Sequence, residues 1–332
     1  MVRSEINASV GMGHAMRCLW IAKALSDLGD DAVVCSETSS AIEGLARIHG
    51  VRRLPVAANR PPVAAEDALA LLAHRPDLVV VDSPKASPVW ADVIGAGQVP
   101  LVVISGEGGP RLEANGCIWP ESCPVGSAPV ASQAFVCGEQ YVPLAPEYWN
   151  GARCKDETGT RRILVTFGGV DHYDISSEAI RALDEVASDK CTMRVIVGAF
   201  YDNVSQIERA AAASRHEIEL VHQPQGLHAH LTWSDFAICA GGTTLYEMCA
   251  LGVPGVGIAV WPLQQAVVDS VVGAGGALGI VYANPEQLAG DLRRALMRLR
   301  TESGLLESLG AAGSRHIDGH GAMRIAEWLK QF

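Results

Sequence analysis

The chain has 332 residues, of which 48% are hydrophobic and 19% charged, a balance that excludes a disordered protein and suits two domains. The net charge of −11 excludes general binding to nucleic acid or to an anionic membrane, although glycine loops and helix N-termini could still hold a diphosphate. No apolar signal segment follows the first residues, and none of the nine cysteines forms a Cys-x-x-Cys pair, so we expect a cytoplasmic protein without membrane insertion.

The first half of the chain predicts alternating strands and helices. Apolar residues at helical spacing predict helices over 15–28, 42–49, 67–72 and 88–96, and apolar runs predict strands over 31–35, 78–81 and 100–104. The stretch SEINAS (4–9) is polar and predicts a poor central strand. The alternation of elements indicates an α/β fold with a doubly wound parallel sheet.

The second half repeats this alternation from about residue 160. Strands are expected over 162–166, 193–197, 218–221, 236–239, 255–260 and 278–281, and helices over 175–186, 203–212, 243–250, 285–300 and 317–331. The stretch 138–160 contains prolines, glycine and a charged run, which is typical of a linker. We therefore expect two domains, 1–150 and 151–332, with the last helix a candidate to pack back on the first domain.

The first glycine loop, VGMGHAMR (10–17), permits two interpretations. Gly11 and Gly13 match two positions of the dinucleotide-binding fingerprint, and Glu37 could bind a ribose, but Met16 stands where the third glycine belongs. NAD(P) binding is therefore the weaker interpretation. The stronger one uses Gly11 and Gly13 to let a nucleotide sugar approach the backbone at a helix N-terminus.

His14 and Arg17 begin the helix that follows this loop. Residues three apart lie on the same helical face, so both side chains should point toward one ligand. A histidine at that place could act as a general base on water or a hydroxyl group. The alternative is structural: His14 caps the helix and Arg17 is a surface charge.

The second candidate site is AGGTTLYE (240–247), at the end of a predicted strand. Gly241 and Gly242 would allow a phosphate to approach, and Thr243 and Thr244 would open a helix with free N–H groups and two hydroxyls. Glu247, one turn into the helix, could accept hydrogen bonds from both ribose hydroxyls. The structural alternative makes Thr243 an ordinary N-cap, with Glu247 completing a pattern like a capping box.

Further polar or glycine-rich positions follow other strands. Gly168 and Gly169 form a third glycine turn, suited to approach of the nucleotide or to a tight turn alone. Gln264 and Gln265 follow a strand and a proline, where they could donate hydrogen bonds to a sugar or simply lie at the surface. His228-x-His230 lacks a nearby third ligand, so we expect no metal and no cofactor.

Four segments resemble the pseudaminic-acid pathway hydrolases, which release UDP from UDP-2,4-diacetamido-2,4,6-trideoxy-β-L-altropyranose. RSEINASVGMGHAMRC (3–18) is similar to the family's opening segment, in which Ile-Gly-x-Gly-His-x-x-Arg-Cys follows Arg-x-Asp-x-Ser. CGEQYVPLAPEYW (137–149), ILVTFGGVD (163–171) and WSDFAICAGGTTLYEMCALGVP (233–254) resemble later segments in the same order. The resemblance runs through both halves of the chain.

This resemblance implies the GT-B architecture, shared with the MurG glycosyltransferase: two Rossmann-like domains that face a central cleft. It implies UDP on the C-terminal domain and the sugar on the N-terminal domain, near His14, Arg17 and Asp82. By this resemblance His14 would activate or position the water that attacks the anomeric carbon. The expected partner is thus a UDP-sugar substrate.

The chain departs from the family pattern in its sugar-facing half. Glu5 replaces the family's aspartate, Ser83 and Pro84 follow Asp82 where relatives often carry an aromatic residue or histidine, and LVVISGEGG (101–109) lacks paired aspartates. These departures leave open a different nucleotide sugar, or a glycosyltransferase that uses an acceptor other than water. A nucleotide-sugar-binding protein without turnover is the alternative from another class.

Overall fold

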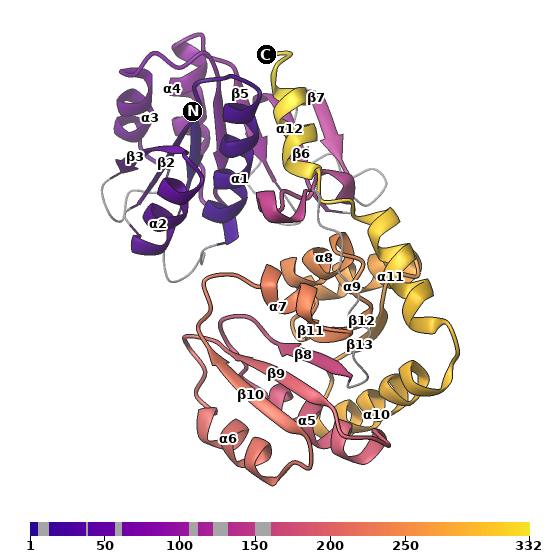
Figure 1. The fold of residues 1–332 in the computed structure, drawn as a ribbon. Coiled ribbons are helices and arrows are strands. Elements are labelled where there is room, and N and C mark those ends of the chain that lie inside the picture. Colours follow the sequence, from indigo (N-terminus) through magenta and orange to yellow (C-terminus); the bar gives the residue numbers. More distant parts are fainter. Residues whose placement is uncertain (6–12, 38, 57–61, 106–111, 122–131, 150–160) are drawn as a thin grey trace. The chain divides into compact units, whose positions relative to one another are not determined.

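The computed structural model describes residues 1–5, 13–37, 39–56, 62–105, 112–121, 132–149 and 161–332 (Figure 1). The chain forms two units, the first comprising Met1–Pro146 with Gly319–Phe332 and the second Glu147–Asp318. The C-terminal segment therefore belongs to the first unit. Among the described residues, no helix is both long and apolar enough to cross a lipid bilayer.

Parallel strands build the sheet of the first unit. Its strands are β1 (Val2–Ser4), β2 (Val33–Glu37), β3 (Arg52–Val56), β4 (Val79–Asp82), β5 (Leu101–Ile104), β6 (Ala114–Trp119) and β7 (Ser132–Cys137). Its helices are α1 (Gly13–Asp27), α2 (Ser40–Ile48), α3 (Ala65–Leu72), α4 (Pro88–Ala96) and α12 (Gly321–Leu329), with the short 3₁₀ turn η1 (Glu139–Tyr141). The strand order is β3-β2-β1-β4-β5-β6-β7, so the direction of winding reverses between β1 and β4.

The polar stretch 4–9, expected to make a poor central strand, contributes only Ser4 to a strand, and residues 6–9 lie outside the described residues. The central strand is β1 (Val2–Ser4), which local patterns did not predict. β1 lies between β2 and β4 and is parallel to both. Its Arg3 side chain is fully buried, and it donates from Nη2 to Asp67 Oδ1 at 3.1 Å and from Nε to Oδ2 at 3.2 Å. Trp90 Nε1 donates to the same carboxylate at 2.8 Å. The buried charge is tolerated because it is paired and hydrogen-bonded.

Alternation along β4 directs its side chains to opposite faces of the sheet. Val79 and Val81 pack in a buried cluster with Trp90 and Ile94 of α4. Since successive side chains of a strand point in opposite directions, Asp82 faces the other side, where α1 packs against β1, β2 and β4. The helix α12 packs against α1 on the same unit.

The second unit is also a parallel sheet with helices. Its strands are β8 (Arg162–Thr166), β9 (Thr192–Val197), β10 (Glu217–His222), β11 (Phe236–Ala240), β12 (Gly255–Ala259) and β13 (Leu278–Val281). Its helices are α5 (Ile175–Val186), α6 (Val204–Ala213), α7 (His228–Trp233), α8 (Thr243–Ala250), α9 (Pro262–Gly273), α10 (Pro285–Thr301) and α11 (Leu305–His316), and the 3₁₀ turn η2 (Pro146–Tyr148) contains the point in the chain where the first unit ends and the second begins. The strand order is β10-β9-β8-β11-β12-β13, which reverses between β8 and β11.

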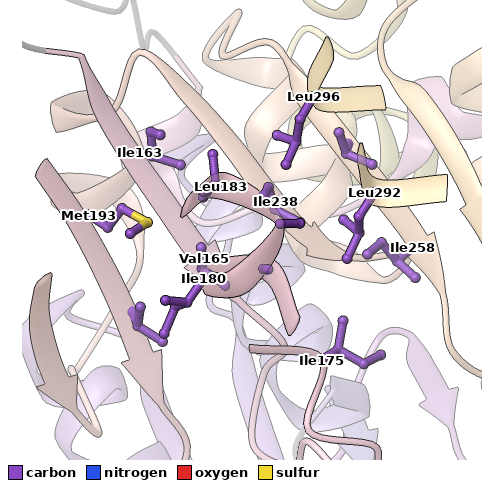
Figure 2. Packing of buried hydrophobic residues seen from close by; sticks show 14 of the residues in the cluster. Ile163, Val165, Ile175, Ile180, Leu183, Met193, Ile238, Ile258, Leu292 and Leu296 are labelled. Carbon is purple, nitrogen blue, oxygen red and sulfur yellow. The ribbon is translucent and has the colours of Figure 1, made fainter. Parts of the chain in front are cut away.

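One face of this second sheet carries the core drawn in Figure 2. Aliphatic side chains of the strands meet those of α5 and α10 there. The labelled members are Ile163 and Val165 of β8, Met193 of β9, Ile238 of β11, Ile258 of β12, Ile175, Ile180 and Leu183 of α5, and Leu292 and Leu296 of α10. This packing fixes the strands, and hence the carboxyl ends from which the site loops begin.

Glycines bring α11 close to the backbone around α8. A Cβ atom added to Gly310 would lie 2.4 Å from the carbonyl oxygen of Gly252, and one on Gly313 would lie 3.3 Å from Cys249 Cα. Glycine is needed at Gly310 for this close approach, although it lowers helix propensity.

Candidate functional site

Three polar side chains meet where the winding of the first sheet reverses. His14 Nδ1 lies 2.7 Å from Asp82 Oδ1, and Arg17 Nη2 donates to the same oxygen at 2.7 Å. Arg17 Nε donates to the other carboxylate oxygen, Oδ2. The Asp82 side chain is 1% exposed, against 27% for His14 and 23% for Arg17. The carboxylate is thus buried behind a histidine and an arginine that remain partly open.

The fold explains why these residues meet. α1 begins at Gly13, so His14 and Arg17 lie one turn apart on its first turns. β1, which precedes this helix, pairs in parallel with β4, and Ser4 lies opposite Asp82. The carboxyl ends of both strands therefore lie at one edge of the sheet, which is where ligands bind in doubly wound folds.

Charges within this group keep the carboxylate ionised. Burial alone would raise the pKa of Asp82, but the charge of Arg17 and hydrogen bonds from Arg17 and His14 together lower it below its ordinary value. For Arg17, burial works in the opposite sense and is outweighed by Asp82, so the pKa of the guanidinium is raised. Arg17 and Asp82 therefore form an ion pair, and the partly exposed His14 contacts the same carboxylate.

The hydrogen bond to Asp82 sets the tautomer of His14. Arg17 Nη2 also lies 2.8 Å from His14 Nδ1, but Nδ1 cannot both donate to Asp82 and accept from Arg17. Since Arg17 already donates to both oxygens of the carboxylate, we assign the proton to Nδ1, which donates to Asp82. The lone pair is then on Nε2, which can accept a proton from water or a hydroxyl group.

A second polar group lies beside this cluster. Ser83 Oγ donates to Glu5 Oε2 at 2.6 Å, and Lys85 Nζ lies 3.0 Å from Glu5 Oε1. Glu5 is buried, while the Lys85 side chain is 47% exposed. Sequence reasoning noted Glu5 and Ser83 only as departures from a family pattern and did not single out Lys85. The signal available in the sequence was position: Glu5 follows β1 and Ser83 follows β4, and the carboxyl ends of these neighbouring parallel strands lie at one edge of the sheet.

The second candidate site lies at the other reversal of winding, where α8 follows β11. Gly242 is the N-cap of α8, and Leu245 N donates to its carbonyl oxygen at 2.9 Å. The amide groups of Thr243 and Thr244 are the donors at this end that a ligand oxygen could meet, because the first N–H groups of a helix have no intrahelical acceptor. The alternative in which Thr243 is the N-cap is wrong, because Gly242 is the N-cap of α8 and no side chain caps this helix.

The paired glycines have different surroundings. A Cβ atom on Gly241 would lie 2.4 Å from Val268 Cγ2, so packing against α9 requires glycine there. A Cβ atom on Gly242 would meet only ordinary contact, at 3.8 Å from Gln264 Nε2. Packing does not explain Gly242, whereas close approach of a phosphate would.

The neighbouring loop after β8 is held in place by its backbone. Gly168 has a φ of +74°, a region that favours glycine, and a Cβ atom on Gly198 of the adjoining loop would lie 2.3 Å from Gly168 O. Asp171 is buried, and its carboxylate accepts from the backbone N–H groups of Ile175 at 2.9 Å and Ser176 at 2.8 Å. Asp171 thus anchors the start of α5 and orients the loop that contains Gly168 and Gly169.

Glu247 lies in an environment that favours its neutral form. Burial, followed by the charge of Glu147, raises its pKa to about 7. Burial and the nearby Glu247 and Glu147 also raise the pKa of Tyr148, whose ring packs edge-on against His228. The sequence pointed to Glu247 but gave no sign that Glu147 would lie within electrostatic reach of it. Glu247 can therefore change protonation near neutral pH.

The two glutamines differ in their roles. Gln264 Oε1 accepts from the backbone N–H of Val260 at 2.9 Å and of Trp261 at 3.3 Å, which stabilises the loop before α9. Its Nε2 is the atom nearest to a Cβ placed on Gly242. Gln265 is exposed. Gln264 is thus the one of the pair that adjoins the glycine loop of α8.

The remaining predicted positions are placed as follows. Gly13 is the first residue of α1, and Gly11 lies outside the described residues. The first unit brings together His14, Arg17 and Asp82, and the second unit places the Gly168 and Gly241 loops after adjacent strands. Among the described residues, no group of three or more His, Cys, Asp or Glu side chains is arranged to hold a metal ion.

Comparisons with known proteins establish the fold. No model of a known protein family matches the chain. MurG of Acinetobacter baumannii has a TM-score of 0.69 at 12% identity, covering 100% of this chain and 99% of that one. Anabaena Alr3699/HepE, solved with UDP, has a TM-score of 0.66 at 15% identity, with 100% and 99% coverage. The spinosyn forosaminyltransferase SpnP has a TM-score of 0.66 at 16% identity, with 99% and 98% coverage.

The predicted architecture is therefore confirmed: two Rossmann-like α/β domains of the GT-B type. Among curated proteins, the chain is similar to the spore coat polysaccharide biosynthesis protein SpsG of Bacillus subtilis (strain 168), at 25% identity over 212 residues. The match covers 60% of this chain and 61% of SpsG, so it spans about three fifths of that relative's length.

Proposed function

We propose that the chain is an enzyme that cleaves a UDP-sugar at the anomeric carbon, with water as the acceptor. The observation that carries this proposal is the 2.7 Å contact between His14 Nδ1 and Asp82 Oδ1 at the reversal of winding of the first sheet. It gives the first unit an oriented, partly exposed base. A binding protein without turnover has no need of one.

The reaction follows from that orientation. His14 Nε2 accepts a proton from water as the water oxygen forms a bond to the anomeric carbon. The bond between this carbon and the diphosphate oxygen breaks, and its electron pair leaves with UDP. Asp82 stabilises the imidazolium that forms, and Arg17 keeps Asp82 ionised by donating to both of its oxygens.

The second unit is assigned the nucleotide. The amides at the start of α8 would donate to the diphosphate, and the positive end of the helix would stabilise the charge on the leaving group. Gly242, which packing leaves unexplained, would admit a phosphate oxygen. Glu247 would accept hydrogen bonds from the ribose. HepE, a structural neighbour, was solved with UDP and with UDP-glucose, which supports this choice of nucleotide.

The sugar is assigned from the resemblance of four segments to the pseudaminic-acid pathway hydrolases. UDP-2,4-diacetamido-2,4,6-trideoxy-β-L-altropyranose is thus the proposed substrate. The similarity to SpsG, whose name places it in the synthesis of a spore coat polysaccharide, supports a role in making an unusual surface sugar.

A glycosyltransferase is the second candidate, because the solved structures with this fold include a named sugar transferase. MurG and SpnP have the same fold, and SpnP is named as a forosaminyltransferase. In that case His14 would take the proton from a hydroxyl group of an acceptor molecule. The chemistry at the anomeric carbon is the same, so the acceptor alone separates the two candidates.

Release of UDP without any added acceptor tests this choice. The purified chain is incubated with the UDP-linked altropyranose, and UDP is followed by chromatography together with the free sugar. Stoichiometric appearance of both products supports the hydrolase. UDP release that depends on an added hydroxyl compound would instead identify the transferase.

A further inference from the structure

An exposed aromatic cluster lies at the carboxyl edge of the second sheet, apart from the residues to which the proposed function assigns a role. We call His172, Tyr173, Trp261 and Tyr282 the aromatic cluster. Tyr173 and Tyr282 stack with ring centroids 4.4 Å apart at 28°. Trp261 lies 5.9 Å from Tyr173 at 50° and 5.8 Å from His172 at 87°. The four residues lie in the loops after β8, β12 and β13, so separate parts of the fold assemble the cluster.

Two rings of the aromatic cluster are strongly exposed to solvent. Trp261 is 46% exposed and Tyr173 is 41% exposed, in a chain with only 5% aromatic residues. Among the described residues of the second unit, the strongly exposed large aromatics are Tyr173, Phe200 and Trp261, and all three follow carboxyl ends of strands. Exposed apolar surface gathered at one ligand-binding edge indicates a binding surface rather than scattered surface residues.

The position of Trp261 relates the cluster to the proposed nucleotide site. Trp261 is the N-cap of α9, and its backbone N–H donates to Gln264 Oε1. The Gln264 side chain also places its Nε2 next to Gly242, at the start of α8. Gln264 therefore bridges the aromatic cluster and the glycine loop. Glu247 lies further along α8, so a nucleotide with its ribose at Glu247 and its diphosphate at Gly242 would extend its sugar toward Trp261.

We propose that the aromatic cluster binds the pyranose ring of the nucleotide sugar through Trp261, and favours sugars with methyl or acetamido substituents. The inference rests on the proposed function, because it needs a UDP-sugar at α8. A pyranose presents C–H groups on its faces, and methyl and acetamido groups add apolar area. An aromatic face can cover such area, and removing apolar area from water is favourable.

Binding measurements by calorimetry test this inference. The probes are UDP, UDP-glucose and UDP-N-acetylglucosamine, and all proteins carry His14→Ala so that no sugar is cleaved. We expect Trp261→Ala to weaken the affinity for UDP-N-acetylglucosamine by about tenfold and to change the affinity for UDP by less than about twofold. Trp261→Phe should restore most of the affinity, and Met297→Ala, an exposed apolar residue of α10, is the matched control.

Three results would overturn the inference. If Trp261→Ala weakened the affinities for UDP and UDP-N-acetylglucosamine equally, Trp261 would contact the base or the phosphates and not the sugar. Unchanged affinity for all probes would make the cluster an ordinary surface, and equal affinity of the parent for UDP-glucose and UDP-N-acetylglucosamine would remove the selectivity. Failure of the parent to bind UDP at all would instead defeat the proposed function itself, so the two failures are distinguishable.

Discussion

His14 Nδ1 lies 2.7 Å from Asp82 Oδ1, although the two residues are 68 positions apart in the chain. The contact exists because β1 and β4 are neighbours and their carboxyl ends share one edge of the sheet. With Nδ1 held by Asp82, Nε2 is the ring nitrogen left to accept a proton. The buried carboxylate, held ionised by Arg17, is what makes this histidine a proposed base rather than a helix cap.

Replacing Asp82 by asparagine should separate its charge from its size. Asp82→Asn keeps an oxygen for His14 Nδ1–H but loses the negative charge that stabilises the imidazolium. We expect kcat to fall on the order of 10²-fold while KM changes little. Steady-state kinetics of UDP release measure both. Asp31→Asn, which alters an exposed carboxylate of the same unit, is the control, and an equal loss in that variant would exclude a specific role for Asp82.

The two glycines before α8 should respond differently to alanine. Gly242→Ala has room for its methyl group, so we expect a folded protein with UDP affinity reduced about tenfold or more. Gly241→Ala would bring the methyl group against Val268, so we expect a loss of stability instead. Thermal unfolding and UDP titration of both variants make the comparison. Normal UDP affinity in Gly242→Ala would remove this glycine from the phosphate site.

The affinity for UDP should rise as the pH increases from 6 to 8. The pKa of Glu247 is about 7, so its carboxyl group is mostly protonated at pH 6 and mostly ionised at pH 8. The ionised form is the better acceptor for ribose hydroxyls. Titrations across this range measure the change. Because UDP itself also ionises, the test is the difference between the parent and Glu247→Gln.

Glu147 supplies a second check of the same effect. Its charge helps to raise the pKa of Glu247, so Glu147→Gln should move the midpoint of the pH dependence downward. A pH profile that is identical in the parent, Glu247→Gln and Glu147→Gln would show that Glu247 does not contact the nucleotide.

Removing Asp67 should destabilise the first unit strongly. Asp67→Ala leaves the buried Arg3 guanidinium and Trp90 Nε1 without this carboxylate, and breaking a buried pair in this way costs about 3–5 kcal/mol of the free energy of unfolding. Asp31→Ala, which breaks the exposed pair with Arg52, should cost about 0–1 kcal/mol. Urea denaturation of the two variants measures both values. Similar small losses would contradict the role given to the buried pair.

Local patterns predicted most elements of the fold. The helices Pro88–Ala96 and Ile175–Val186 and the strand Arg162–Thr166 have the bounds that periodicity predicts. β1 was missed because its polar residue Arg3 is stabilised by Asp67, 64 positions away, and no local pattern reveals such a pair. α11 was missed because Gly310 and Gly313 lower its helix propensity, and the packing that needs them is long-range.

The candidate site was predictable to a similar extent. The spacing of His14 and Arg17 predicted a shared helical face, and each glycine loop after a strand was visible in the sequence. The resemblance implied a place for Asp82 near the sugar, but its contacts with His14 and Arg17 depend on the order of strands, which the sequence does not state. The aromatic cluster was not predicted, because its rings come from three separate loops.

The most direct test of the central claim is UDP release by the parent protein and by His14→Ala, from saturating UDP-2,4-diacetamido-2,4,6-trideoxy-β-L-altropyranose without an acceptor. The account predicts rapid release by the parent, a loss of about 10²-fold or more in His14→Ala, and an unchanged UDP dissociation constant. Undiminished turnover in His14→Ala, or UDP binding by the parent with no release from this substrate, would contradict it.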